Sequence, residues 1–391
     1  MLEKHSRNHA LRHTASIMMV PNVAKAQAPW PSRYELLDGL RGLAALAVLL
    51  HHLQIVSIGH FAVMVFFIIS GYCITASADS SLVAGTGFRA FMVRRVRRIY
   101  PPYLLALTYY SITRVIKAAL LGPNELNRPA LDWLQNLTLT QWVSNVFHPV
   151  QWPGQNPTLF VAAFWSLNYE EQFYLIMGIG LFAALRLGIP LMWTVLAIGI
   201  AGLAWNWLIP GNWICGFFVE YWVHFALGSC LYFALCRYTG TRSRWTFVSL
   251  TALLGSMCFI RLIPVNADTI YDMRAMVELS LLSVVTLVLF FLRPYSSRVI
   301  GYKLWRPIAI LGTISYSLYL IHQFNLTVIE SVARFLLPTR SPQFVTFVVV
   351  VALHLALATV FWYCCERPFL RKSHRTPRDR GPPPLAIPFP K

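Results

Sequence analysis

An arginine and a histidine bound an apolar run, RGLAALAVLLHH, that reads from Arg41 to His52. In an α-helix eleven residues make roughly three turns plus 20°, so Arg41 and His52 share one face about 16 Å apart. His51 lies about 80° from Arg41, on another face. Ionisable groups in an apolar helix usually carry function, and a histidine suits proton removal from a hydroxyl. The structural alternative is an arginine reaching the membrane interface and a histidine hydrogen-bonded in the bundle.

Four arginines stand directly before another apolar block, in FMVRRVRRIYPP: Arg94, Arg95, Arg97 and Arg98. Positive charge beside an apolar block is typical of a cytosolic loop, so topology alone could explain the cluster. Guanidinium groups also bind phosphates through paired hydrogen bonds. We expect Pro101 and Pro102 to end the cluster, which would suit a phosphate-rich cytosolic donor such as an acyl-coenzyme A.

Two carboxylates, Glu170 and Glu171, occur in FWSLNYEEQFYLI at the expected outer end of a further apolar block. On a helix, Glu170, Phe173 and Tyr174 share a face. One of the carboxylates could orient a histidine or a ligand hydroxyl. The alternative is a pair of interfacial carboxylates without a role in chemistry.

A fourth group of polar side chains lies within the apolar segment ISYSLYLIHQ: Ser315, Ser317, Tyr319 and His322. Ser315, Tyr319 and His322 recur at i, i+4 and i+7 and would line one side of a helix. They are candidates for contacts with substrate. Hydroxyl groups also hold transmembrane helices together, and that alternative stays open.

The elements that must position these groups are membrane-spanning helices. Hydrophobic residues make up 57% of the 391-residue chain and charged residues only 12%, whereas soluble proteins carry about 25% charged residues. The apolar residues gather in blocks of membrane-span length. The sequence predicts an all-α, polytopic transmembrane bundle of about ten helices. The blocks are residues 34–55, 60–77, 99–121, 164–185, 190–210, 215–236, 245–264, 274–292, 307–335 and 344–365.

The distribution of basic residues predicts the topology. With both termini in the cytosol, 25 of the 33 Lys and Arg residues fall on the cytosolic side, as the positive-inside rule requires. The net charge of +18 therefore indicates a bilayer and not nucleic acid as the partner. The long outward loop, residues 122–163, contains Trp133, Trp142 and Trp152, which we read as interfacial anchors, with contact to an acceptor as the alternative. Residues 131–142 could form a short interfacial helix.

The ends of the chain and its cysteines add little chemistry. We expect residues 1–33 to form a cytosolic tail. Residues 371–391 are basic and Pro-rich, and we expect them to form a disordered tail. The chain has 7 cysteines and none stands in a CxxC pair, so neither a metal site nor a disulfide framework is expected. We interpret them as small apolar packing residues.

Six motifs taken together resemble the membrane-bound acyltransferase 3 family. In chain order they are LDGLRGLAALAVLLHH, FFIISGY, RRVRRIYP, FWSLNYEEQFY, SYSLYLIH and CERPF at residues 365–369. Each is weak alone, and the order of all six is specific. The resemblance covers residues 34–370, which it identifies as one transmembrane acyltransferase domain. Asn168 and Tyr169 replace the Ser-Val of many relatives, and Glu170 is retained.

The resemblance implies a ten-helix enzyme of the inner membrane that moves acyl groups, commonly acetyl, from cytosolic acyl-CoA to hydroxyls. The acceptors would be cell-surface, exported or lipid-linked carbohydrates. Its motifs fall on His52 and Arg41, on Arg95 and Arg98 as the donor-phosphate site, and on Glu170 and His322. Some relatives carry an esterase-like domain that completes transfer, so a separate extracytoplasmic partner is one possibility. No permanently bound cofactor is implied, and His52 could act as base or as a transient acyl carrier.

Two other classes of function are compatible with parts of the sequence. A transporter or flippase of a lipid-linked glycan would also have intramembrane charges, but it would usually show repeated halves, and the sequence shows no repeat. A sensory or scaffold protein would leave Arg95 and Arg98 as topology signals only. Loss of CoA binding on joint replacement of Arg95 and Arg98 by lysine would exclude that class. The acceptor and the acyl group are not specified by the sequence.

Overall fold

The computed structural model describes residues 33–122, 126–150, 152–208, 215–237, 269–338 and 340–370. Over these ranges the chain forms helices and connecting turns and no β-strand, which confirms the predicted all-α class. The block expected at residues 245–264 lies outside the described residues, as do most of the N-terminal tail and the whole of the C-terminal one.

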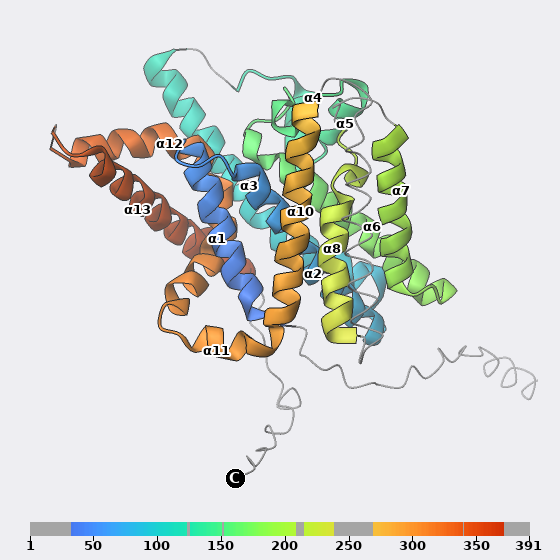
Figure 1. The fold of residues 1–391 in the computed structure, drawn as a ribbon. Helices are drawn as coiled ribbons and strands as arrows, with labels where there is room; N and C mark the ends of the chain where they lie inside the picture. The colour runs from blue at the N-terminus through green and yellow to red at the C-terminus, as the bar shows by residue number, and fades with distance from the viewer. Residues whose placement is uncertain are drawn as a thin grey trace, which may run out of the picture. The chain divides into compact units, whose positions relative to one another are not determined.

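The remaining expected blocks correspond to helices. The longer ones are α1 Glu35–His52, α2 Gly59–Val83, α3 Gly87–Leu121, α6 Trp165–Leu187, α7 Leu191–Leu208, α8 Trp222–Tyr232, α10 Thr269–Leu292, α12 Trp305–Leu336 and α13 Gln343–Phe361 (Figure 1). The shorter ones are α4 Ala130–Thr138, α5 Trp142–Phe147, α11 Ser296–Gly301 and the 3₁₀ turns η1 Pro153–Gln155, η2 Ala162–Phe164, η3 Phe218–Glu220, η5 Arg293–Tyr295 and η7 Arg367–Phe369. The π-helical turns η4 Phe233–Arg237 and η6 Trp362–Glu366 extend α8 and α13.

The contacts between residues divide the chain into two compact units. The first contains the chain up to Met92 together with Ala130–Thr313, and the second contains Val93–Pro129 and the chain from Ile314 onward. Two of the boundaries fall inside the continuous helices α3 and α12, and the third falls directly before α4. Each unit is described separately below.

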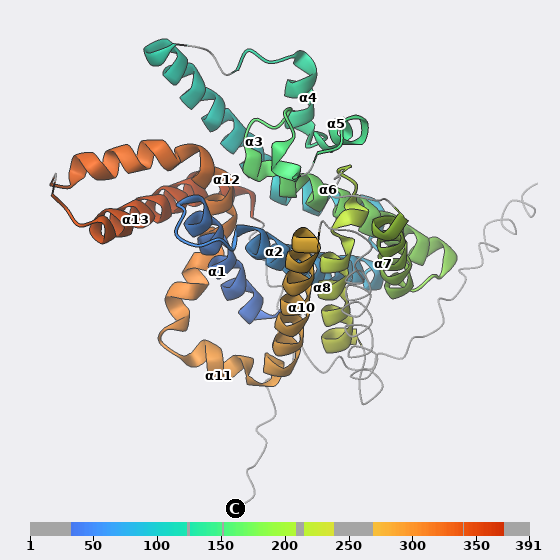
Figure 2. The ribbon, with the colours of Figure 1, turned by 45° about the horizontal axis from the view of Figure 1, so that its top comes forward.

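Helix α2 lies at the centre of the first unit, where it contacts α1, α6, α8 and α10 (Figures 1 and 2). Two glycines allow α2 and α8 to approach closely. A Cβ at Gly71 would lie 2.0 Å from the Phe225 carbonyl oxygen, and one at Gly228 would lie 1.8 Å from that of Ile68. Small residues bring helix backbones together in membranes in this way. The FFIISGY motif therefore allows α2 and α8 to pack closely at Gly71, next to Ser70.

The second unit contains most of α3, the larger part of α12, and α13. The expectation that Pro101 and Pro102 end the arginine-bearing segment is wrong, because α3 continues through both prolines. A proline inside a helix removes one backbone donor and displaces the carbonyl four residues earlier, which neighbouring side chains can compensate in a membrane helix. Close to the prolines, the Tyr316 hydroxyl of α12 donates to the Ile99 carbonyl oxygen at 3.1 Å and joins the two helices.

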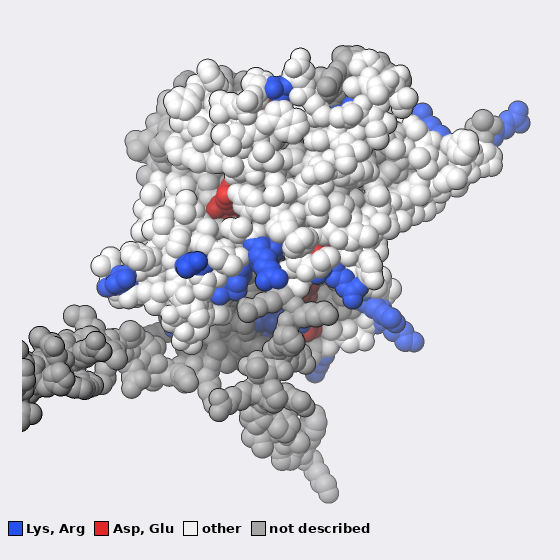
Figure 3. Space-filling model, turned by 180° about the vertical axis from the view of Figure 1, so that it is seen from behind, with Lys and Arg blue, Asp and Glu red and all other residues white. Residues whose placement is uncertain are grey.

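Among the described residues, three segments are long and apolar enough to cross a membrane: residues 59–83, 280–301 and 343–369. Other helices expose apolar side chains at helical spacing, which suits contact with lipid. Such exposed residues are Leu175, Ile179 and Phe182 on α6, Leu281, Val284, Val288 and Phe291 on α10, and Val328, Val332 and Phe335 on α12. Figure 3 shows a face of the molecule on which most of the surface is neither basic nor acidic. These features indicate a membrane protein.

The part of the first unit between α4 and α6 is folded around buried amides. Asn136 donates to the Thr158 carbonyl oxygen at 2.7 Å and accepts from Gln141 at 2.9 Å, and Asn156 donates to the Gln141 carbonyl oxygen at 2.8 Å. The single helix expected over residues 131–142 is two helices, α4 and α5. The break falls at Leu139, whose φ of 55° lies in the left-handed region that does not continue a right-handed helix.

Candidate functional site

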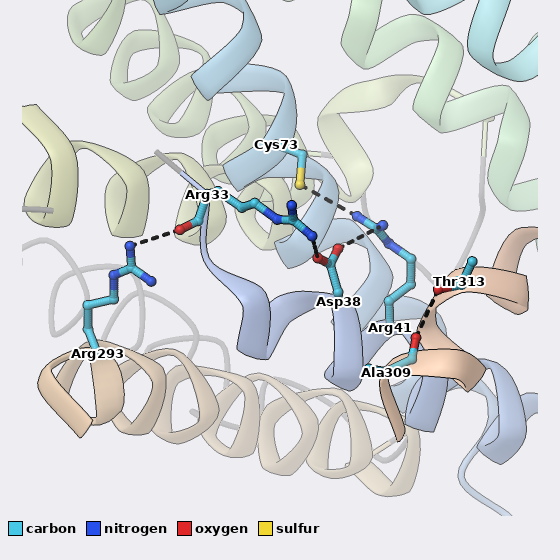
Figure 4. A network of polar contacts seen from close by, with 7 residues as sticks. All are labelled: Arg33, Asp38, Arg41, Cys73, Arg293, Ala309 and Thr313. Carbon is cyan, nitrogen blue, oxygen red and sulfur yellow. Dashed lines mark hydrogen bonds and ion pairs between the residues drawn. The ribbon is translucent and has the colours of Figure 1, made fainter. Parts of the chain in front are cut away.

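Arg41 and His52 belong to one uninterrupted helix, α1, as the sequence predicts. Arg41 sits in its first half, where its guanidinium lies 3.6 Å from the Asp38 carboxylate and 3.5 Å from the Cys73 thiol of α2 (Figure 4). Its side chain is 17% exposed. Asp38 thus compensates part of the charge that Arg41 brings into the bundle.

A basic network surrounds this pair. The Asp38 carboxylate also lies 3.7 Å from the Arg33 guanidinium, and Arg293 donates to the Arg33 carbonyl oxygen at 2.9 Å (Figure 4). The Arg293 guanidinium is stacked 4.5 Å from the centre of the Tyr34 ring. Asp38 is a site residue that was not predicted, although its position three residues before Arg41 is the spacing of an intrahelical ion pair.

His51 and His52 end α1 with their ring centres 5.3 Å apart. The His51 Nδ1 lies 3.2 Å from the Val56 carbonyl oxygen. Its ring packs against Gly59, since a Cβ there would lie 2.3 Å from the His51 Cδ2. His51 is therefore engaged in the turn between α1 and α2.

Glu170 lies in the first third of α6 and is partly exposed. The Ser70 hydroxyl of α2 donates to its Oε1 at 3.0 Å, and the Tyr174 hydroxyl donates to the same oxygen at 2.7 Å. The predicted i, i+4 proximity of Glu170 and Tyr174 is confirmed. Because both donors reach one oxygen, they orient the carboxylate.

The residues that flank Glu170 fix α6 to the loop before α8. The Tyr169 hydroxyl donates to Glu220 Oε2 at 2.6 Å. Gln172 donates to the Gly216 carbonyl oxygen at 2.9 Å and accepts from the Phe218 amide at 2.9 Å. Tyr169 is one of the two residues at which the sequence departs from the motif of many relatives. That departure marked Tyr169 as unusual but did not indicate Glu220 as its partner.

Glu220 is a carboxylate that the sequence analysis missed. It lies in the turn η3, because α8 begins only at Trp222 and not at residue 215 as the apolar block suggested. Burial raises the pKa of the Glu220 carboxyl to about 7, while hydrogen bonds from Tyr169 and from the backbone amide of Cys215 lower it. It therefore titrates close to neutral pH.

In the second unit the polar face of α12 is buried. The His322 Nδ1 lies 2.8 Å from the Tyr319 carbonyl oxygen, and the two rings are 5.8 Å apart. The Ser317 hydroxyl donates to Glu366 Oε2 at 2.6 Å, in the CERPF motif. Ser315 is buried on the same helix. The structure thus gives Ser317 a partner within the chain and leaves the predicted contacts of Ser315, Tyr319 and His322 with a substrate as predictions.

Arg95 and Arg98 lie one turn apart in the part of α3 that belongs to the second unit. Arg95 is partly buried and Arg98 is exposed. The site residues expected from the sequence divide accordingly: Arg41, His52 and Glu170 lie in the first unit, and Arg95, Arg98, Ser315, Ser317, Tyr319 and His322 in the second. The described part of the chain holds no group of three or more His, Cys, Asp or Glu residues placed to bind a metal ion.

The sequence model of the acyltransferase 3 family, described as an acyltransferase domain, matches residues 34–363. The chain belongs to this family. The match includes the helices that carry Arg41 and His52, Arg95 and Arg98, Glu170 and His322. The chain therefore carries an acyltransferase domain, and the resemblance predicted from its six motifs is confirmed.

Curated relatives of this acyltransferase match shorter parts of the chain. OatA from Listeria monocytogenes, a peptidoglycan O-acetyltransferase, is 30% identical over 194 residues, which is 45% of this chain and 29% of OatA. YrhL from Bacillus subtilis, described provisionally as a peptidoglycan O-acetyltransferase, is 33% identical over 155 residues, 36% of this chain and 22% of YrhL. SACOL0978 from Staphylococcus aureus, described provisionally as an O-acetyltransferase, is 30% identical over 149 residues, 36% of this chain and 23% of SACOL0978.

The matched part is thus less than a third of the length of each of these relatives. No solved protein structure matches this acyltransferase. Membership in the family therefore rests on sequence, and the geometry described above comes from the chain itself.

Proposed function

We propose that the chain is an integral O-acyltransferase of the plasma (inner) membrane. It would transfer an acyl group, most simply acetyl, from cytosolic acyl-CoA to a hydroxyl of a cell-surface, exported or lipid-linked carbohydrate. The observation that carries the proposal is the family match over residues 34–363, which contains every candidate site residue. The multi-pass topology of about ten spans with cytosolic termini belongs to this proposal.

The relatives favour a carbohydrate acceptor. OatA is named for O-acetylation of peptidoglycan, and YrhL provisionally so. Both reactions esterify a sugar hydroxyl, which is the chemistry that a histidine base in a membrane acyltransferase would serve. The acceptor hydroxyl is accordingly the proton donor in the proposed mechanism.

His52 would accept the proton of the acceptor hydroxyl while the oxygen of that hydroxyl attacks the carbonyl carbon of the acyl-CoA thioester. The C–S bond then breaks, the new C–O ester bond forms, and CoA leaves as its thiol after taking up the proton. General base catalysis of this kind contributes about 10²- to 10⁴-fold in rate. The alternative within the same proposal is a transient acyl group on His52 itself.

The other residues would bind and orient the two substrates. Arg95 and Arg98 would bind the donor phosphates, since guanidinium groups make paired hydrogen bonds with phosphate oxygens. Arg41 places a positive charge on the face of α1 that carries His52, three turns nearer the donor end. Glu170, held by Ser70 and Tyr174, and His322 would position acceptor or donor groups.

The test is replacement of His52 by alanine, with His51→Ala as the matched control. We expect His52→Ala to lower acetylation of the native glycan by about 10²-fold or more, since the base is lost. His51→Ala should retain most of the activity, because His51 serves the turn after α1. Acetyl content is measured by mass spectrometry of envelope and secreted glycans, with the inserted protein quantified in the same cells. Normal acetylation by a normally inserted His52→Ala chain would contradict the mechanism.

A further inference from the structure

Four aromatic rings meet at the end of the first unit's helices: His60 of α2, Trp165 of α6, Tyr221 before α8, and Trp152 from the outward segment. The His60 ring centre lies 4.9 Å from that of Trp152, 6.3 Å from that of Trp165 and 6.1 Å from that of Tyr221. Trp152 and Trp165 are 5.4 Å apart. We call these four residues the aromatic cluster.

The aromatic cluster is held rigidly. Trp152 packs over Gly154, where a Cβ would lie 2.9 Å from the indole nitrogen. Tyr221 follows Glu220, which accepts hydrogen bonds from Tyr169 and from the Cys215 amide. A side chain fixed in advance loses little conformational freedom when a ligand binds.

Exposure distinguishes one member of the aromatic cluster from two others. Trp165 is 5% exposed and Tyr221 is 8% exposed, whereas Trp152 is 38% exposed. Trp165 and Tyr221 are therefore the buried members of the aromatic cluster, and Trp152 is the member whose side chain a ligand could reach. The Trp152 ring thus packs against His60 and Trp165 and still keeps more than a third of its surface exposed.

The aromatic cluster and the histidine end of α1 are close along the chain. His60 follows Gly59, against which the His51 ring packs, and His51 lies beside His52. An aromatic platform fixed in place, followed by imidazoles, combines a stacking surface with groups that handle protons. Ligand sites commonly pair aromatic walls with a few such polar groups.

We propose that Trp152, with His60 beside it, is the acceptor subsite and takes a sugar ring of the glycan. This inference rests on the proposed function. One face of a pyranose ring is a sheet of C–H groups and packs on an indole, while its hydroxyls project from the edge. A sugar stacked on Trp152 would bring its hydroxyls within reach of the neighbouring His60 imidazole. Carbohydrate is favoured over a purely apolar ligand because the groups beside the platform are imidazoles.

The experiment compares Trp152→Leu, Trp152→Phe and Trp133→Leu in the full-length chain reconstituted in lipid. Trp133 is a matched control, since it lies in the same outward segment but packs on Phe160 at 4.6 Å. The substrates are acetyl-CoA and an un-acetylated GlcNAc–MurNAc oligosaccharide. We expect Trp152→Leu to raise the acceptor KM about tenfold or more, which corresponds to the loss of one good contact, and to leave the acetyl-CoA KM unchanged. Trp152→Phe should recover part of the loss, and Trp133→Leu should resemble wild type.

A second measurement on the wild-type chain does not depend on the folding of any variant. Hydrogen exchange should slow in residues 152–165 when the oligosaccharide is added. An unchanged acceptor KM in Trp152→Leu, or no slowing in wild type that transfers acetyl to the oligosaccharide, would overturn the subsite. A wild-type chain that neither binds acetyl-CoA nor transfers acetyl would instead contradict the proposed function.

Discussion

Two serine–glutamate pairs, one in each unit, differ in their surroundings. In the first unit Ser70 donates to Glu170 at 3.0 Å, and in the second unit Ser317 donates to Glu366 at 2.6 Å. Ser317 and Glu366 are 0% and 7% exposed, whereas Ser70 and Glu170 are both partly exposed. The chemistry of the two pairs is the same, and access is what separates them.

The difference in exposure separates an accessible carboxylate from a buried one. Glu366 is closed in by the packing of α12 and the end of α13, so its hydrogen bond serves to hold these elements together. Glu170 receives two hydroxyl donors on one oxygen and has an accessible side. We therefore expect changes at Glu170 to alter catalysis and changes at Glu366 to alter stability.

The largest effect is expected for Glu170→Gln, with Glu171→Gln as the control. Glutamine retains the size of the side chain and an oxygen that Ser70 and Tyr174 can reach, but it removes the charge. Acetyl transfer per folded molecule should fall about 100-fold, within the range for loss of a charged group that orients reacting groups. The melting temperature should hardly change. Wild-type turnover in Glu170→Gln would break the comparison.

Glu366→Ala should act on stability instead. It leaves the buried Ser317 hydroxyl without its acceptor, which costs about 1–3 kcal/mol. The expected result is a lower thermal midpoint in detergent, measured by size-exclusion chromatography of heated samples. Turnover per folded molecule should stay close to wild type. A large loss of turnover at unchanged stability would place Glu366 in the reaction and remove the distinction between the two pairs.

The serines give a smaller, paired test. Ser70→Ala removes one of the two donors to Glu170, a change of about 0.5–1.5 kcal/mol, so turnover should fall about two- to tenfold. Ser317→Ala should lower the thermal midpoint and leave turnover nearly unchanged. The distinction between the two pairs is supported if Ser70→Ala lowers only turnover and Ser317→Ala lowers only the thermal midpoint. It fails if both variants lower the same quantity.

The last test concerns Glu220, a third carboxylate held by a hydroxyl. The pKa of this carboxyl is raised by burial from 4.5 to about 7, so between these pH values the folded chain binds more protons than the unfolded chain. Its contribution to stability is therefore complete below pH 4.5 and is lost as the pH rises to about 7. In Glu220→Gln the thermal midpoint should depend less on pH over this interval. An identical pH profile in both chains would contradict the raised pKa.

Much of the fold was predictable because lipid imposes a simple rule on sequence. Backbone groups in a bilayer must be satisfied within each segment, so long apolar blocks become helices, as α2, α6 and α12 do. The ends of the elements were less predictable. Pro101 and Pro102 lie inside α3, since a membrane helix can tolerate proline, and Leu139 divides a segment expected to be one helix.

The candidate site was predictable to the extent that its residues are spaced along single helices. Arg41 and His52 on α1, and Glu170 and Tyr174 on α6, follow from helical geometry. The partners from other elements did not follow: Ser70 for Glu170, Glu220 for Tyr169 and Glu366 for Ser317 are separated by 100, 51 and 49 residues. The roles predicted for the site residues remain predictions.

The sequence by itself determined the helical class, the family and the faces on which its ionisable residues stand, because all three depend on local periodicity and on ordered motifs. Only the tertiary structure decided which carboxylate is open and which is closed, and that Trp152 packs against His60 and Trp165. Burial and contact depend on which helices pack side by side, and that packing is set by residues far apart in the chain.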